Sequence, residues 1–199
     1  SQSYYDLPSY KKCLDKGELP TFRGMKLSKD DKIRQHATQQ LRSYFSIDFK
    51  QFEKNFAALH NSKFGILVNS GTSALNTIYG AINPDPGSEV ICTPWTSIGS
   101  VSGAIFQGMV PVFADIDETL CIDPIDVERK ITRKTRAIVA VHMFGNPCDM
   151  EKLLEISRKY NLFLIEDCTQ AHFSKYQNKI VGSIGDISAW GFSEHQHLT

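Results

Sequence analysis

An aspartate near the end of the chain directly follows a run of apolar residues. Leu162-Phe163-Leu164-Ile165 leads into Glu166-Asp167-Cys168-Thr169-Gln170-Ala171-His172. A carboxylate at the end of a buried strand can face a ligand. Beside the nitrogen of a heteroaromatic ring it keeps that nitrogen protonated, which makes the ring an electron sink. Taken by itself, Asp167 is better explained as a helix cap or a structural hydrogen-bond acceptor.

A second candidate site begins where glycine and small hydroxyl residues follow another apolar run. Gly65-Ile66-Leu67-Val68 is followed by Asn69-Ser70-Gly71-Thr72-Ser73-Ala74-Leu75. Such residues at a helix start leave backbone N–H groups open at the positive end of the helix dipole, which together bind anions. An ordinary Ser/Thr cap with a tight turn explains this motif equally well.

His142 ends a third apolar run, and Gly145-Asn146-Pro147 then forces a turn. A histidine at this place can contact a ligand, although a structural role is more common for a lone histidine.

These motifs are embedded in an alternation of apolar runs and helical patterns. Runs without polar alternation suit strands that are covered on both faces, and strand–helix alternation predicts an α/β fold with a mostly parallel sheet. Ligands of such sheets bind at the carboxyl ends of the strands. The predicted strands are residues 65–68, 89–92, 111–114, 137–141 and 162–165, and the predicted helices are 71–79, 97–106, 125–131 and 150–160.

The composition of the chain argues against several classes of protein. The 199 residues carry 22 basic and 22 acidic side chains, whereas nucleic-acid binders usually have a basic excess. No apolar run is long enough for a membrane span, and the first residues do not resemble a signal peptide. The five scattered cysteines predict buried thiols in a reduced, cytoplasmic protein, with neither disulfides nor a metal site.

The chain is predicted to consist of two parts. Residues 1–60 form an N-terminal segment with helices, in which a helical pattern from about Lys29 to His60 is interrupted at Ser46-Ile47-Asp48. Residues 61–199 form the α/β domain.

Together the motifs resemble the DegT/DnrJ/EryC1/StrS aminotransferases, which are pyridoxal-phosphate (PLP) enzymes that mostly act on keto sugars attached to nucleotides. The resemblance implies a three-layer sandwich, the large domain of an aspartate-aminotransferase-like fold. It also implies an amino-acid donor and a homodimer. It covers most of the chain from about Phe52, through residues 52–57, 69–75, 110–117, 141–147, 165–172 and 185–187.

The resemblance also implies roles for individual residues. Gly71 and Thr72 would offer backbone N–H groups to the PLP phosphate. Asp167 would pair with the pyridine nitrogen, and Gln170 would lie near the ring hydroxyl. Family members continue with a small C-terminal domain, so we expect this chain to correspond to the large domain only.

The chain departs from the family pattern at three positions. Gln196 occupies the place of the lysine that forms the Schiff base, and Gly191 that of a phosphate-binding serine. Ser97 replaces an aromatic residue that stacks on the ring, and Trp95 is the nearby aromatic that can compensate. An amide is neither nucleophilic nor basic near neutral pH, and loss of a general base costs on the order of 10²–10⁴ in rate. We therefore expect any bound PLP to be non-covalent.

Three functions remain open at this point. The first is an impaired PLP-dependent sugar aminotransferase. The second is a PLP-dependent keto-sugar dehydratase that uses a histidine base, for which His195 and His197 flank Gln196. The third is a non-catalytic homologue that acts as a binding or assembly subunit.

Overall fold

The structure is a computed structural model that describes residues 2–3, 21–23 and 48–192. The chain divides into two compact units, Ser1–Phe52 and Glu53–Thr199. In the first, β1 (Gln2–Ser3) pairs antiparallel with β2 (Thr21–Arg23). Helix α3 (Phe49–Leu59) confirms the last part of the predicted helical pattern, and the rest of that pattern lies outside the described residues. The division into 1–60 and 61–199 stays a prediction.

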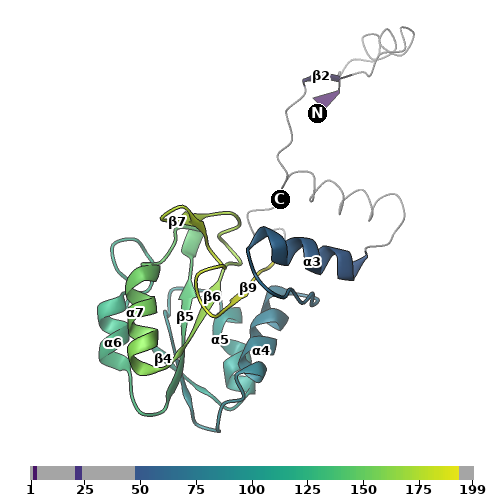
Figure 1. Ribbon diagram of the computed structural model, residues 1–199. Coiled ribbons are helices and arrows are strands. Elements are labelled where there is room, and N and C mark those ends of the chain that lie inside the picture. Colours follow the sequence, from purple (N-terminus) through teal and green to yellow (C-terminus); the bar gives the residue numbers. More distant parts are fainter. Residues whose placement is uncertain (1, 4–20, 24–47, 193–199) are drawn as a thin grey trace, which may run out of the picture. The chain divides into compact units, whose positions relative to one another are not determined.

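The second unit is built on a sheet of five parallel strands in the order β4-β3-β5-β6-β9 (Figure 1). This confirms the predicted α/β class. Four of the predicted strands form, and β9 follows Gly185-Asp186. The bounds are β3 (Glu89–Cys92), β4 (Val110–Phe113), β5 (Thr135–Val141), β6 (Phe163–Asp167) and β9 (Ile187–Ala189).

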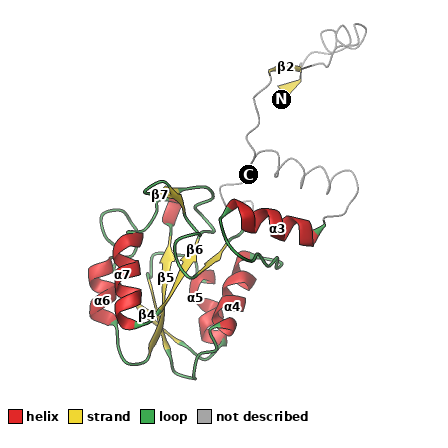
Figure 2. Cartoon of the chain, in the orientation of Figure 1, coloured by secondary structure: helices red, strands yellow, loops and turns green. Residues whose placement is uncertain are grey.

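Helices cover both faces of this sheet and produce three layers, with α4 and α5 on one face and α6 and α7 on the other (Figure 2). The helices are α4 (Gly71–Ala81), α5 (Gly99–Phe106), α6 (Pro124–Lys130) and α7 (Met150–Tyr160), which confirms all four helices predicted for this part of the chain. A short 3-10 helix, η1 (Met143–Gly145), follows β5. The hairpin β7 (Lys175–Tyr176) and β8 (Lys179–Ile180) lies between β6 and β9.

The alternation of side chains along β5 shows why the strands are apolar throughout. Val139 belongs to the core beneath α4 and α5, whereas Ile138 and Ala140 belong to the core beneath α6 and α7. Successive side chains of a strand point to opposite faces. Both faces are covered here, so neither set of positions tolerates polar residues.

The prediction of a strand at residues 65–68 was wrong. This segment is irregular, and the side chains of Phe64 and Ile66 are 75% and 76% exposed. Within the described residues no strand pairs with it, and the N–H of Leu67 donates instead to Glu53 Oε1 at 2.7 Å. An apolar run forms a strand only where another strand supplies hydrogen bonds.

Gly103 allows α5 to approach α4 closely. A Cβ atom on Gly103 would lie 2.6 Å from Asn76 Cα and 2.9 Å from its nitrogen, which are backbone atoms that cannot move independently. We expect Gly103→Ala to lower the free energy of unfolding by about 1–3 kcal/mol, as other over-packing changes do. Urea denaturation followed by circular dichroism measures this change.

Gly80→Ala provides the matched control. Gly80 is also helical, but its Cβ would meet only the Gln107 side chain, at 3.5 Å. Since alanine is a better helix former than glycine, Gly80→Ala is expected to be neutral or stabilising. Equal losses of stability in the two variants would contradict the close-contact explanation.

Candidate functional site

Asp167 is the buried carboxylate at the end of β6, and only 2% of its surface is exposed. Each of its oxygens has a hydrogen-bond donor from a different part of the chain. Ser100 Oγ donates to Oδ2 at 2.7 Å, while the backbone N–H and the hydroxyl of Thr169 donate to Oδ1 at 3.1 and 2.7 Å. All these groups donate, so the site is built for a carboxylate that still has lone pairs to offer.

The first turn of α4 lies near the same end of the sheet. Ser70 caps the helix, because its Oγ accepts the N–H of Ser73 at 3.1 Å. The alternative of an ordinary cap is therefore correct for Ser70. Helix geometry leaves the N–H groups of Gly71 and Thr72 without acceptors inside the helix, and these are the groups predicted to hold a phosphate.

Two other segments of the chain pack closely against Gly71 at this helix start. A Cβ atom on Gly71 would lie 3.0 Å from Thr169 Cγ2, 3.3 Å from Gly191 Cα and 3.4 Å from the Trp190 carbonyl oxygen. The starts of α4 and α5 are also adjacent, since a Cβ on Gly99 would lie 3.0 Å from Thr72 Oγ1. Residues distant in sequence thus meet around Gly71.

Gln170 is oriented by a strained residue in η1, the short helix that follows β5. Its Oε1 accepts the N–H of Phe144 at 3.3 Å, which leaves the amide NH₂ available as a donor. Phe144 has a φ of 51°, a region that bulky residues rarely adopt. The half-buried Gln170 is therefore placed by Phe144 of η1, directly before the predicted turn at Gly145-Asn146-Pro147.

His142 is a structural histidine, the outcome that is more common for a lone histidine. Its Nδ1 accepts the N–H of Cys148 at 3.1 Å, so the proton is on Nε2, which donates to Glu166 Oε2 at 3.2 Å. Both side chains are fully buried. No ring nitrogen remains for a ligand.

Glu166 is the hydrogen-bond acceptor for a whole loop. Besides the bond from His142, its Oε2 accepts the N–H of Gly182 at 2.7 Å, and its Oε1 accepts those of Ile184 and Gly185 at 2.8 and 2.6 Å. Burial raises the pKa of Glu166, but the hydrogen bonds from His142, Gly185 and Gly182 outweigh burial, and the pKa is lowered overall.

The cluster of His142, Glu166 and Cys168 has the composition of a metal site, with potential ligand atoms within 4.8 Å of one another. However, both ring nitrogens and both carboxylate oxygens already have hydrogen-bond partners. The cluster is better described as a structural support beneath Asp167.

The described cysteines are buried and free, as predicted: Cys92, Cys121, Cys148 and Cys168. Cys13 lies outside the described residues. Burial, and then the charge of Asp167, raises the pKa of Cys92. Burial likewise raises that of Cys168, so both thiols stay neutral. The exception is Cys121, whose pKa is lowered to about 6, chiefly by its hydrogen bond with Cys148.

The other predicted site residues are less well defined. Trp95 is half exposed and donates its backbone N–H to Thr93 Oγ1 at 3.1 Å, and Ser97 Oγ accepts the backbone N–H of Gly99 at 3.3 Å. Both lie in the segment between β3 and α5. Gln196 and His195 lie outside the described residues, so their roles stay predictions.

Ser100 and Thr169 are site residues that the sequence analysis did not identify. Thr169 lies within the motif that follows Asp167, where a small hydroxyl residue two positions after a carboxylate often forms a local turn. Ser100 is 67 residues away from Asp167, and only its place in the first turn of a helix after a strand end hinted at this role.

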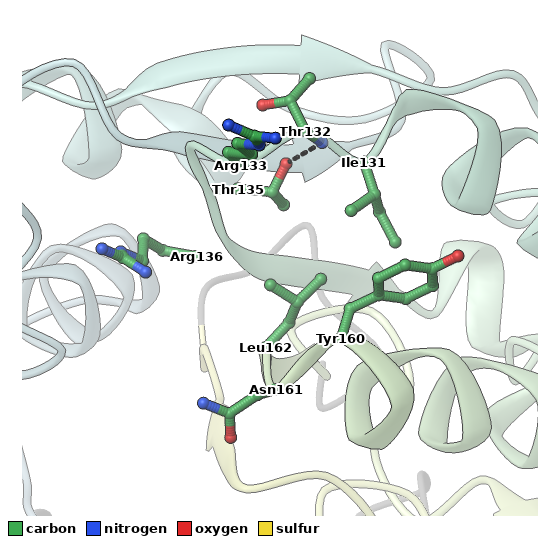
Figure 3. A pocket seen from close by; sticks show the side chains of 8 residues that line it. All are labelled: Ile131, Thr132, Arg133, Thr135, Arg136, Tyr160, Asn161 and Leu162. Atoms are coloured by element: carbon green, nitrogen blue, oxygen red, sulfur yellow. Dashed lines mark hydrogen bonds between the residues drawn. The ribbon is translucent and has the colours of Figure 1, made fainter.

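A separate pocket lies at the opposite, amino end of β5 and β6. Figure 3 shows the side chain of Ile131 pointing toward those of Tyr160 and Leu162, with Arg133 and Arg136 farther away (Figure 3). Its lining residues, all in the described part of the chain, include no carboxylate, thiol or histidine. It is therefore not part of the site around Asp167.

Within the described residues, no helix combines the length and the apolar character that crossing a membrane requires.

Comparison with known proteins agrees with this geometry. The DegT/DnrJ/EryC1/StrS aminotransferase family matches residues 28–199. GDP-perosamine synthase of Escherichia coli O157:H7 is 42% identical over 151 residues, which are 75% of this chain and 42% of that protein. The chain spans less than half the length of the curated relatives it matches.

Solved structures match as well. S. venezuelae DesV, in complex with a ketimine intermediate, has a TM-score of 0.76 at 30% identity, over 84% of this chain and 47% of that one. NtdA from Bacillus subtilis, with bound cofactor PMP, has a TM-score of 0.71 at 28% identity, over 85% of this chain and 40% of that one. This chain belongs to the DegT/DnrJ/EryC1/StrS aminotransferase family.

Proposed function

We propose that this chain forms the PLP site of a sugar aminotransferase, at the carboxyl ends of β3, β5 and β6. The observation that carries the proposal is Asp167. It is a buried carboxylate whose two oxygens are held by Ser100 and Thr169. Ligands of parallel sheets bind at this edge.

The residues around Asp167 fit the coenzyme. The N–H groups of Gly71 and Thr72 lie at the positive end of α4, which suits a phosphate. A Cβ atom on Gly71 would be crowded by Thr169 and Gly191, so glycine suits the start of this helix. The NH₂ group of Gln170 is free to donate.

Each residue would then have a defined task. PLP supplies an electron-withdrawing ring that stabilises negative charge on a substrate carbon. Asp167 would keep the ring nitrogen protonated, Gly71 and Thr72 would hold the phosphate, and Gln170 would orient the ring. Gln196 has no amine to offer, so the coenzyme would be held without a covalent bond and transamination would be impaired.

The proposed substrates rest on what the relatives are named for. GDP-perosamine synthase is named for a nucleotide-linked amino sugar, which supports a nucleotide-linked keto sugar as acceptor and an amino acid as donor. A homodimer is proposed on the same family basis.

Asp167→Ala is expected to weaken PLP binding by about 10- to 100-fold. A hydrogen bond to a charged group is worth about 1.5–3 kcal/mol, and each 1.4 kcal/mol changes the dissociation constant tenfold. Titration of the chain with PLP, followed by absorbance and by tryptophan fluorescence, measures the dissociation constant.

Asp85→Ala is the control for this titration. Asp85 is an exposed aspartate whose carboxylate lies 3.7 Å from the guanidinium of Arg136. Arg136 is at the start of β5, so this pair lies at the other end of the sheet from Asp167. Its loss should leave PLP binding unchanged. If Asp167→Ala bound PLP as tightly as the unmodified chain, the proposed site would be wrong.

A non-catalytic binding or assembly subunit is the second candidate, and Gln196 is the observation that favours it. Such a protein would bind PLP or a partner subunit without turnover. Transfer of an amino group from glutamate to a keto-sugar nucleotide by the unmodified chain would eliminate this candidate.

A further inference from the structure

A chain of hydroxyl groups reaches Asp167 from the segment after β3. Ser100 Oγ lies 2.7 Å from Asp167 Oδ2, and Thr96 Oγ1 lies 2.8 Å from Ser100 Oγ. A carboxylate can only accept, so the hydroxyl proton of Ser100 is directed to Asp167. Thr96 must then donate to Ser100, which fixes the direction of both bonds.

Ser100 is itself held firmly. It is 3% exposed, its N–H donates to the Ser97 carbonyl at 3.0 Å, and its own carbonyl accepts the hydroxyl of Tyr79. Burial raises the pKa of Tyr79 well above its usual value, and the charge of Asp167 raises it further. Tyr79 therefore remains a neutral donor, and Ser100 is fixed through its backbone as well as its hydroxyl.

The two oxygens of Asp167 are fixed by different elements. Thr169, in the turn after β6, holds only Oδ1. The terminal torsion of an aspartate is broad and roughly two-fold, so a carboxylate held at one oxygen can still swing. Ser100, at the start of α5, holds the second oxygen and removes this freedom.

We propose that Ser100, supported by Thr96, is a positioning residue that sets the plane of the Asp167 carboxylate toward the coenzyme ring. The inference rests on the proposed function, because the ring is what the carboxylate would face. Ser100 does not itself touch the coenzyme in this scheme. It acts by presenting Asp167 in one orientation before the ring arrives, which lowers the ordering cost of binding.

A double-mutant cycle on the full chain tests the positioning role. Ser100→Ala is expected to weaken PLP binding about 10-fold, and to have no further effect when Asp167 is already alanine. The same coupling should appear without coenzyme, as non-additive losses of stability in urea denaturation. Ser100→Thr, which keeps the hydroxyl, should restore most of the binding.

Ser157→Ala is the matched control, because Ser157 is also 3% exposed and its hydroxyl donates to the Leu154 carbonyl in α7. It should leave PLP binding unchanged. Thr96→Val provides a milder variant if Ser100→Ala does not fold, with an expected loss of binding of a few-fold.

The two proposals fail in different ways. Additive stability effects of Ser100→Ala and Asp167→Ala would overturn the positioning role. Coupled stability effects, with no PLP binding to the unmodified chain, would support the contact and refute the proposed coenzyme.

Discussion

Replacing Glu166 by alanine is expected to lower the free energy of unfolding by about 3–5 kcal/mol, because several hydrogen-bond donors lose their shared acceptor. Glu166 accepts hydrogen bonds from His142 and from the N–H groups of Gly182, Ile184 and Gly185. Alanine would leave all four donors without this acceptor, and those of His142 and Gly182 are buried. Each such group carries a desolvation cost of about 1–3 kcal/mol, reduced where water can enter. Urea denaturation at neutral pH measures the loss.

Glu128→Ala is the control for this experiment. Glu128 also accepts two hydrogen bonds, from Lys159 at 2.8 Å and Tyr160 at 3.1 Å, but on the protein surface. Exposed pairs contribute little, so this variant should unfold like the unmodified chain. Equal effects of the two substitutions would show that Glu166 does not organise the 182–185 loop.

Because the pKa of Glu166 is lowered, the stability difference between Glu166→Ala and the unmodified chain is expected to depend on pH. A carboxyl group whose pKa is lower in the folded state stabilises the protein fully above its unfolded pKa of about 4.3. This contribution disappears as the pH falls through the folded pKa. Glu166→Ala removes the group, so the variant should lose less stability than the unmodified chain over that acidic range. A parallel decline in both proteins would show that other carboxyl groups dominate.

Much of the architecture could be predicted because strands that are buried on both faces appear in the sequence as continuous apolar runs. β5 and β6 read as continuous apolar runs since α4 and α5 cover one face and α6 and α7 the other. The helices were predicted from the helical patterns between these runs, and the structure adds that Asp149 caps α7.

The segment 65–68 shows where local pattern fails. Its apolar run looks like that of β3, yet Phe64 and Ile66 are exposed and Leu67 bonds to a side chain. Whether an apolar run becomes a strand depends on a pairing partner elsewhere in the chain, and a run of residues contains no information about that partner.

Parts of the candidate site could be predicted where a sequence motif and the observed geometry coincide. Asp167, Gly71 and Gly191 were expected from their motifs, and the structure brings Gly71 and Gly191 together. The hydrogen bonds that hold these residues were not predictable. Ser100 and Asp167 are 67 positions apart, and His142 and Glu166 are 24 apart. Only the parallel order β3-β5-β6 determines that these positions meet.

Gln196→Lys is expected to convert non-covalent PLP binding into covalent attachment. The resemblance to the family implies a lysine at this position, and a primary amine condenses with the coenzyme aldehyde whereas an amide does not. After borohydride reduction, intact-mass measurement should show one PLP per chain in Gln196→Lys and none in the unmodified protein. This is a change from no covalent product to a stoichiometric one.

Two further lysine variants test whether covalent labelling requires a lysine at position 196 or only a lysine elsewhere in the chain. Ser193→Lys introduces the same amine three residues earlier, and Gln177→Lys introduces it in the exposed turn between β7 and β8. Neither should retain PLP after reduction at stoichiometric coenzyme.

The double variant Gln196→Lys with Asp167→Ala should label more slowly, because an amine reacts efficiently only with a coenzyme that is already held in place. If the unmodified chain itself became labelled, a lysine already present in the sequence would be serving the site. The assignment of position 196 would then be wrong, although the position of Asp167 at the end of β6 would be unaffected.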